Sequence, residues 1–347
     1  MVLLTFRDLV YRKTRFIVVT LLGAVVFALL FVMTGLVEQF NLEPFDTVEV
    51  FGADAWVVPE GISGPFTASS AAPAEAIDAV EATTKSAVVV SRSSVVGDGK
   101  ADEVILVGHE TGGLGSPETS EGRAAESTGE LVADATAGLE VGQEVTVAGV
   151  PFTVVGETKN TTLLAGIPVV FMTLPDAQDL VFRTNDVISA VLVDGEVGAV
   201  PPGSKVMTSD EVADDVLEPL EGAIASIDLV RVLLWIVAGI IVGAVVYLSA
   251  LDRQRDFAVL KAVGAPNSSL LGSLAIQAVL VALAAVAVAA VIQLFLAPQF
   301  PLEVRVPARA FWQLPLLAVV MALVAGAAGM RKVLRSDPSQ AFSGAGA

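Results

Sequence analysis

The stretch FIVVTLLGAVVFALLFVMTGLV, from Phe16 to Val37, decides the fold class of this chain. It runs for 22 residues without a charged side chain. At about 1.5 Å per residue, a helix of this length crosses the roughly 30 Å hydrocarbon core of a bilayer. The stretch is longer than the apolar core of a signal peptide, about 7–15 residues, and no small-x-small cleavage site follows it. It therefore predicts a transmembrane helix that remains as an anchor.

Three further apolar runs follow later in the chain. The sequence has 347 residues, of which 54% are hydrophobic and 17% charged, a balance too apolar for an ordinary soluble domain. The uncharged runs are Val232–Leu251, Leu270–Ala297 and Ala310–Met330. We therefore predict a membrane protein with four transmembrane α-helices in a one-plus-three layout. The predicted spans are residues 16–37, 229–251, 270–297 and 310–330.

Basic residues gather on one side of this four-span arrangement, which sets its orientation. Positive charges close to the ends of spans stay in the cytoplasm. We therefore expect residues 1–15, 252–269 and 331–347 on the cytoplasmic side of a bacterial plasma membrane. Residues 38–228 and 298–309 are expected on its outer side. The N-terminal segment fits a helix lying on the anionic inner leaflet or a plain basic flank of the first span. The basic residues concerned are Arg7, Arg12, Lys13, Arg15, Arg253, Arg255, Lys261, Arg331, Lys332 and Arg335.

Residues 38–228 read as a large extracytoplasmic α+β domain. This region holds 33 of the 38 acidic residues and 7 of the 20 basic ones, so it would repel rather than bind nucleic acid. Short β-rich runs bounded by Gly, Pro and Asp alternate with helix-like segments. Strands are expected in Asp54–Val58, Ser86–Ser91, Glu103–Gly108, Pro168–Leu174 and Ser189–Asp194, with a hairpin at Val145–Val155 turning at Ala148-Gly149. Helices are expected in Pro73–Thr84, Leu174–Arg183 and Ser209–Leu220, and a mobile Gly/Ser-rich loop in His109–Arg123.

The chemistry of an enzyme is missing from the sequence. There is no cysteine, and His109, expected as a solvated loop residue, is the only histidine. A two-histidine metal site and a hydrolytic triad that needs a second histidine are therefore excluded. The string nearest to a nucleotide-binding loop, SVVGDGKA, has Ser94 in place of the first Gly and Ala101 after the Lys. We predict no catalytic residue, and we expect any ATP hydrolysis to occur on a separate subunit.

Acidic pairs raise the question of a cation site. Asp102-Glu103 and Asp214-Asp215 are more typical of a solvated face than of a metal site. Calcium stays an alternative, but no Asp-x-Asp-x-Asp-Gly loop is present. We predict no metal and no cofactor in this chain.

Small residues in the predicted spans indicate close helix packing. Gly239 and Gly243 form a GIIVG repeat, and Gly326 follows Ala322 by four residues. Such spacing places small residues on one helical face and lets two backbones approach. Packing within one chain and a homodimer seam both fit this pattern. Gln277 and Gln293 could form hydrogen bonds between helices, and neither is assigned to a substrate.

The segment RQRDFAVLKAVGAPNSSLL, Arg253 to Leu271, joins the second and third predicted spans. Its basic and apolar residues alternate as in a short helix that ends at Gly264-Ala265-Pro266. This loop resembles that of the FtsX-like permeases of the MacB type, the type VII membrane subunits of ABC transporters. The C-terminal RSDPSQAF, GLEVGQEVTVAGVPFTVVGE and VVFMTLPDAQDL are similar to further motifs of that family. Together the motifs, in family order, cover most of the chain.

The resemblance implies a homodimer that binds two ABC ATPase subunits, which supply ATP and Mg²⁺ binding. By its motif, the ATPase-coupling element would comprise Asp256, Phe257, Leu260, Lys261 and Gly264. The alternative for this loop is a plain basic connector.

The function implied is that of the permease subunit of an ATP-driven exporter. ATPase motion would pass through the spans to the extracytoplasmic domain, by mechanotransmission, and expel an amphiphilic or lipid-like substrate: haemin, lipid, peptide or drug. Haemin is among the candidate substrates because shorter haem-exporter-type permeases have a similar size and layout. The alternative is an FtsX-like signalling device that activates an extracytoplasmic partner without transport. A membrane-tethered enzyme is a third, weaker class. The sequence assigns no substrate-binding residue, no direction of movement and no outer-membrane partner.

Overall fold

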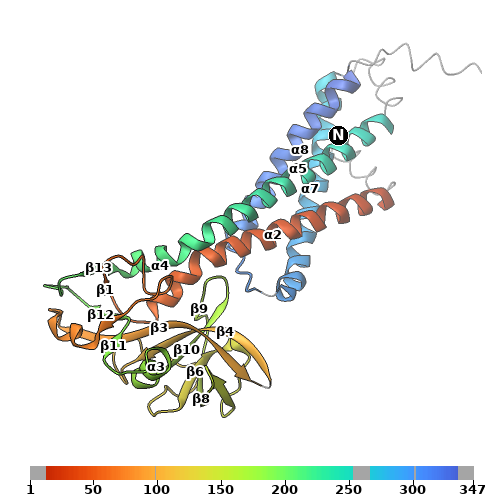
Figure 1. Cartoon of the computed structure of the whole chain (residues 1–347). Coiled ribbons are helices and arrows are strands. Elements are labelled where there is room, and N and C mark those ends of the chain that lie inside the picture. Colours follow the sequence, from red (N-terminus) through yellow and green to blue (C-terminus); the bar gives the residue numbers. More distant parts are fainter. Residues whose placement is uncertain (1–12, 98, 253–265, 301, 335–347) are drawn as a thin grey trace, which may run out of the picture. The chain divides into compact units, whose positions relative to one another are not determined.

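The computed structural model describes residues 13–97, 99–252, 266–300 and 302–334. They form two compact units, which are coloured along the chain in Figure 1. The helical unit comprises Met1–Glu38 and Ala225–Ala347, and the α+β unit comprises Gln39–Ile224. One long helix, α2 (Lys13–Glu49), belongs to both units, because the boundary falls within it.

The helical unit is built from apolar helices whose backbone groups bond within each helix, as a bilayer requires. After α2 come α5 (Glu221–Asp252), α7 (Asn267–Leu296) and α8 (Ala310–Leu334). Three helical segments are long and apolar enough to cross a membrane: Phe16–Glu49, Ser209–Ala244 and Leu274–Gln299. The predicted fourth span coincides with α8, where Ala310–Val324 forms a shorter apolar stretch. The predicted fold class, membrane helices with a large α+β domain after the first, is confirmed.

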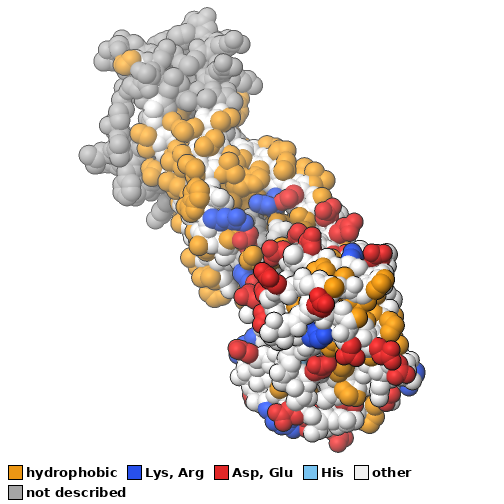
Figure 2. Space-filling model, turned by 90° about the vertical axis from the view of Figure 1, so that its left-hand side faces the viewer, with side chains coloured by type: hydrophobic (Ala, Val, Ile, Leu, Met, Phe, Trp, Pro, Cys, Tyr) orange, Lys and Arg blue, Asp and Glu red, His pale blue; other side chains and the backbone are white. Residues whose placement is uncertain are grey.

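Alanine dominates the core of the helical unit. Ala28 of α2, Ala238 of α5, Ala282 of α7 and Ala318 of α8 are all buried in one cluster. Side chains this small let the helices approach closely, as is usual in membrane bundles. Aromatic pairs fill the wider gaps: Phe27 with Trp235, and Phe31 with Phe311. Larger apolar side chains point outward and cover much of the described surface of this unit (Figure 2).

A mixed sheet forms the α+β unit. Among the described residues it has eleven strands in the order β13-β1-β12-β3-β4-β10-β6-β8-β5, with β7 pairing with β3 and β8, and β9 with β10. Strands β2 and β11 form a separate ribbon. The pairs β4–β10 and β6–β8 are parallel and the rest are antiparallel. The strands are β1 Ala55–Pro59, β2 Ala72–Pro73, β3 Thr84–Gly97, β4 Lys100–His109, β5 Glu121–Gly122, β6 Glu130–Asp134, β7 Glu144–Val147, β8 Val150–Thr158, β9 Thr162–Leu163, β10 Ile167–Thr173, β11 Val187–Ile188, β12 Ala190–Asp194 and β13 Ser204–Thr208.

Helices cover both faces of this sheet. Alternate residues of the central strands enter two separate cores, as the two-residue period of a strand requires. One core packs Trp56, Phe171 and other strand residues against the end of α2 and against α4 (Ser209–Leu217). The other packs the opposite strand residues against α3 (Leu174–Val181). The central strands are therefore buried on both sides, which explains runs such as VILV in β4.

Most of the predicted elements are confirmed. All five single strands appear, and β7 and β8 form the predicted hairpin. Its turn residues Ala148 and Gly149 have φ of 49° and 88°, as a type I′ turn requires. The capping box of α4, in which Thr208 and Glu211 satisfy each other's backbone amides, marks a helix start within the predicted segment.

Two expectations are wrong. The helix predicted over Pro73–Thr84 is a single 3₁₀ segment, η1 (Ala74–Ala79), and β3 already begins at Thr84. His109 is a buried strand residue rather than a solvated loop residue, since it ends β4 in the sheet. The predicted loop follows His109 and forms hydrogen bonds with its surroundings: the amide of Gly115 donates to the carbonyl of Phe51, and the amide of Leu114 donates to the Ser86 hydroxyl.

Candidate functional site

The residues singled out in the sequence occupy separate places. The five proposed coupling residues Asp256, Phe257, Leu260, Lys261 and Gly264 lie outside the described residues. Gly239 of α5 faces α8: a Cβ at this position would lie 2.9 Å from Cε of Met321. This contact is within one chain. Gly243 lies one turn further along α5, and Gly326 lies in α8.

The polar membrane residues of α7, Gln277 and Gln293, are both buried within the helical unit. Polar side chains at such positions join helices. Their burial gives no reason to assign either to a substrate.

The end of α2 is bonded into the α+β unit by two buried polar side chains. Glu43 is 2% exposed, and its carboxylate accepts hydrogen bonds from the Thr162 hydroxyl at 2.6 Å and from the amides of Ala165 at 3.0 Å and Gly166 at 2.7 Å. One helical turn later, the Thr47 hydroxyl donates to the Thr162 carbonyl at 2.6 Å. A buried carboxylate is stable only when it is paired or hydrogen-bonded in this way. We call these four bonds the helix clamp.

The partner of the helix clamp is the turn between β9 and β10. Leu164, Ala165 and Gly166 adopt φ of 55°, 69° and 92° in succession. The left-handed conformation is costly for a leucine or an alanine, so the surrounding contacts must hold it. It directs consecutive amides toward one point, an arrangement that binds anions. The Glu43 carboxylate occupies that point.

A second buried carboxylate, Asp134, extends this network. It lies at the end of β6 and caps the short 3₁₀ turn η2 (Ala135–Ala137). One oxygen accepts from the Thr136 amide at 2.9 Å and hydroxyl at 2.7 Å. The other accepts from the amide and hydroxyl of Thr161, both at 2.8 Å. Because Thr161 adjoins Thr162, the two carboxylates hold neighbouring residues of the same loop.

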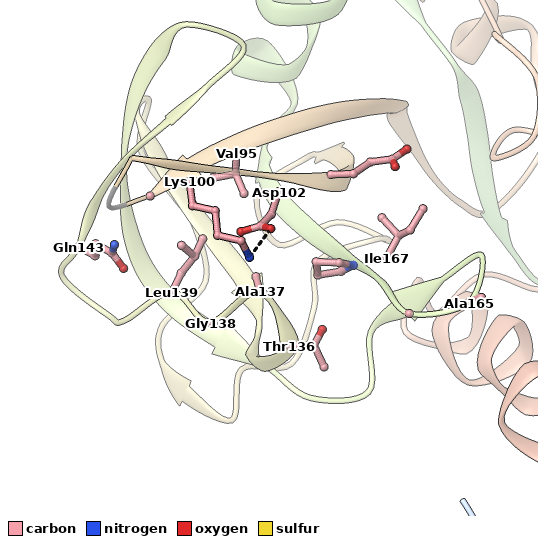
Figure 3. A pocket seen from close by; sticks show the side chains of 14 residues that line it. Val95, Lys100, Asp102, Thr136, Ala137, Gly138, Leu139, Gln143, Ala165 and Ile167 are labelled. Carbon is pink, nitrogen blue, oxygen red and sulfur yellow. Dashed lines mark ion pairs between the residues drawn. The ribbon is translucent and has the colours of Figure 1, made fainter. Parts of the chain in front are cut away.

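A pocket of about 530 Å³ lies beside this network (Figure 3). The tip of the β3–β4 hairpin forms one wall, and η2 and the β9–β10 turn form the others. Lys100 and Asp102 extend from the hairpin, with Nζ and Oδ1 2.8 Å apart. Leu139 and Ile167 supply apolar surface. The volume falls in the range of about 300–1,000 Å³ that is usual for small-ligand sites.

Side chains at two described places of the α+β unit have pKa values that differ from their ordinary ones. Burial lowers the pKa of His109, against the opposing effect of its hydrogen bond with the Glu110 carbonyl. The imidazole is therefore neutral at pH 7 and packs against Phe171. A bidentate contact with the Arg123 guanidinium lowers the pKa of Glu130 from 4.5 to about 2, and two backbone amides add to the effect. Across the described residues, no group of three or more His, Asp and Glu is placed to hold a metal ion.

Comparison with known proteins gives relatives along nearly the whole chain. Residues 229–338 match the family described as FtsX-like permease C-terminal. An uncharacterized ABC transporter permease of Mycobacterium tuberculosis is 39% identical over 350 residues, which is 99% of this chain and 100% of the relative. A second one from the same organism is 38% identical over 348 residues, with the same coverage.

The chain belongs to the FtsX-like ABC transporter permease family. This permease is therefore a multi-pass membrane protein, and the membership inferred from its motifs is confirmed. Among solved structures, the periplasmic region of MacB from Actinobacillus actinomycetemcomitans covers 50% of the permease and 98% of that chain, with a TM-score of 0.35 and 12% identity. The extracellular domain of the transporter YknZ from Gram-positive bacteria covers 45% and 99%, with a TM-score of 0.33 and 14% identity.

Sequence reasoning did not find the helix clamp or the Asp134 network of this permease. Asp134-Ala-Thr136 has the spacing of an Asx-type turn, in which an Asp side chain bonds an amide two residues on. That local signal could have marked Asp134. Nothing in the sequence around Glu43 signals its partners, because they lie more than a hundred residues away.

Proposed function

We propose that this permease is the membrane subunit of an ATP-driven exporter and that α2 transmits ATPase motion to the α+β unit. The helix clamp supports the transmission through α2. A helix that transmits force needs a firm attachment at its far end. Glu43 and Thr47 provide four hydrogen bonds there, one side chain being a fully buried carboxylate.

The energy of the attachment supports this role. Hydrogen bonds to a charged group contribute about 1.5–3 kcal/mol each, and a buried acceptor left unsatisfied costs about 1–3 kcal/mol. Pulling the helix end away from the β9–β10 turn would leave several such groups unpaired. A displacement of the end of α2 should therefore move the turn with it rather than break the clamp.

The proposal includes partners that the ABC permease family implies. An ATPase subunit in the cytoplasm binds ATP and Mg²⁺, and this chain itself is not an enzyme. Two copies of the permease form the membrane part, with the α+β unit outside the cell and both termini inside. The substrate class is amphiphilic or lipid-like, with haemin, lipid, peptide and drug as the candidates.

Exchange of Glu43 for glutamine tests the transmission. In Glu43→Gln one oxygen must replace a carboxylate that accepts three donors, and the new NH₂ group faces amides. We expect that ATP changes the hydrogen exchange of the 161–167 segment in the wild-type complex, measured by mass spectrometry with the partner ATPase in lipid. In the variant this ATP-dependent change should fall severalfold. Glu49→Gln, an exposed site on the same helix, is the matched control and should behave as wild type.

Two results of that experiment decide the proposal. A loss confined to Glu43→Gln, with the ATPase still bound, supports transmission through the clamp. A full ATP-dependent change in Glu43→Gln overturns it.

Leu260→Asp tests the cytoplasmic contact. A charge on the apolar side of the proposed coupling element should weaken ATPase binding, since an unpaired carboxylate does not tolerate burial in an interface. We expect the ATPase to be lost from the copurified complex while the permease still inserts into the membrane. Unchanged copurification and ATPase stimulation would show that Leu260 is no part of the contact.

A signalling device remains the second candidate, because the family name covers FtsX-like proteins and the clamp serves either role. Purified complex in vesicles separates the two. Export requires that a lipid, peptide or tetrapyrrole changes ATPase activity, and mass spectrometry of the copurified material would identify it. ATPase activity that responds only to an extracytoplasmic hydrolase would decide for signalling.

A further inference from the structure

The pocket beside the clamp combines opposite charges with apolar surface. Lys100 and Asp102 form an ion pair whose side chains are 80% and 42% exposed. Exposed pairs contribute little to stability, so a ligand can separate them at little cost. Glu103 also lines the pocket and lies 3.6 Å from Arg92. The ammonium and the carboxylate of the Lys100–Asp102 pair can both bind a ligand.

Polar and apolar groups around this pair restrict the ligand further. The Gln143 amide oxygen accepts from the Glu140 backbone at 2.9 Å, which leaves the NH₂ group to donate. Leu139 and Ile167 offer contacts to an aliphatic side chain (Figure 3). A purely anionic or purely cationic ligand would leave one of the two charges facing its own sign, which costs affinity.

We infer that this pocket binds a small zwitterion of the amino-acid or dipeptide class. Lys100 receives the ligand carboxylate, Asp102 receives its ammonium group, and Leu139 and Ile167 contact an aliphatic side chain. The site lies wholly within the α+β unit of one chain.

The position of the pocket gives the ligand a second role, which rests on the proposed function. Thr136, in one wall, is held by Asp134, and Ala165 and Gly166, in another, are held by Glu43. A ligand that touches both walls therefore acts on the turn to which the end of α2 is bonded. Because coupling is reciprocal, a motion of α2 that shifts these walls changes ligand affinity by the same factor.

Binding is tested on the full chain in lipid nanodiscs without the ATPase, by calorimetric titration. The probes are Ala-Leu, its N-acetyl form and its C-terminal amide, which delete the ammonium or the carboxylate singly. We expect Ala-Leu to bind and each blocked form to bind about tenfold more weakly or worse, as loss of a charge-assisted hydrogen bond implies. Failure of Ala-Leu to bind, or equal binding of the blocked forms, overturns the assignment.

Two variants test which side chain binds which charged end of the ligand. Lys100→Gln should weaken Ala-Leu but leave the already weak C-terminal amide unchanged, and Asp102→Asn should weaken Ala-Leu but leave the N-acetyl form unchanged. Lys159→Gln, an exposed lysine outside the pocket, is the control and should bind as wild type. Variants that weaken all three probes equally would contradict the assigned pairing.

Coupling is measured separately from binding. Ala-Leu should alter hydrogen exchange of the 161–167 segment and of the end of α2 in the wild type, and only of the pocket walls in Glu43→Gln. If Ala-Leu binds but the hydrogen exchange of α2 does not change, the proposed coupling is wrong. The assignment of the pocket to a zwitterion would still stand. The proposed function would still be judged by its own ATP-dependent test.

Discussion

Two buried carboxylates of the α+β unit hold the loop that precedes β10. Glu43 and Asp134 are 2% and 1% exposed, and each accepts several hydrogen bonds from the same loop. Backbone amides and hydroxyls donate the hydrogen bonds that hold both carboxylates in place. A carboxylate held in this way has strict geometry, since every donor has a fixed position. This is why we place the transmission at Glu43.

The surface pair of Arg123 and Glu130 gives a prediction on pH. The pKa of Glu130 is lower in the folded chain than its ordinary 4.5. The pair therefore stabilises the fold above pH 4.5 and loses this contribution as the pH falls from 4.5 toward 2. Because the pair is exposed, solvent screens it and its contribution is small.

Thermal unfolding of Glu130→Gln measures this contribution. The variant should be less stable than wild type at neutral pH, and the difference should vanish as the pH falls from 4.5 toward 2. Glu60→Gln, at another exposed site, should show no such convergence. A difference that is constant over the whole acid range would contradict the role of the pair.

At the scale of elements, the packing of α3 on the sheet depends on one glycine. A Cβ at Gly108 of β4 would lie 2.1 Å from Cβ of Ala177 in α3. Two carbon atoms cannot approach so closely, so the helix must shift. We expect Gly108→Ala to lower the free energy of unfolding by about 1–3 kcal/mol, the usual cost of an overpacked core. Denaturant unfolding of the full chain in detergent measures it.

Gly222→Ala is the matched control for this prediction. Gly222 lies in α5, and a Cβ there meets no atom within 4 Å. The added methyl group should be neutral or stabilise by up to about 1 kcal/mol through helix propensity. Equal effects of the two exchanges would show that the close contact of β4 and α3 does not limit stability.

Among the three segments that are long enough to cross a membrane, the one that contains α5 is the least buried within the chain. Only 11% of the most apolar stretch of its segment is buried within one chain. The corresponding share is 44% for the α2 segment and 33% for the α7 segment. Leu233, Ile236 and Ile240 lie on one face and are more than half exposed. We expect this face to meet the second copy of the proposed homodimer, in agreement with the absence of a covering helix in the described part of the chain.

Cysteine cross-linking tests the dimer seam cleanly, because the chain contains no cysteine of its own. Ile240→Cys should form a covalent dimer when membranes are oxidised. Val320→Cys, an exposed apolar position of α8, serves as the comparison and should remain monomeric. Cross-linking at Val320 but not at Ile240 would place the seam on α8 instead.

Local patterns in the sequence predict the membrane class, the one-plus-three layout and seven of the eleven strands of the sheet, namely β1, β3, β4, β7, β8, β10 and β12. These features follow from local patterns: uncharged runs long enough for a bilayer, and β-rich runs between turn residues. The segment Pro73–Thr84 shows the limit of such patterns. Its proline start favours a helix, but pairing of β3 with β4 and β12 recruits Thr84 onward into the sheet.

The clamp, the pocket and the burial of His109 depend on the tertiary fold. Glu43 bonds with the 162–166 turn across more than a hundred residues, and Lys100 lines one pocket with η2 because the fold brings these segments together. Such pairings depend on strand order and on which strand face a residue occupies. Neither quantity is local in the sequence. The physical reason is that a side chain's partners are set by packing, whereas the pattern along the chain sets only its own secondary structure.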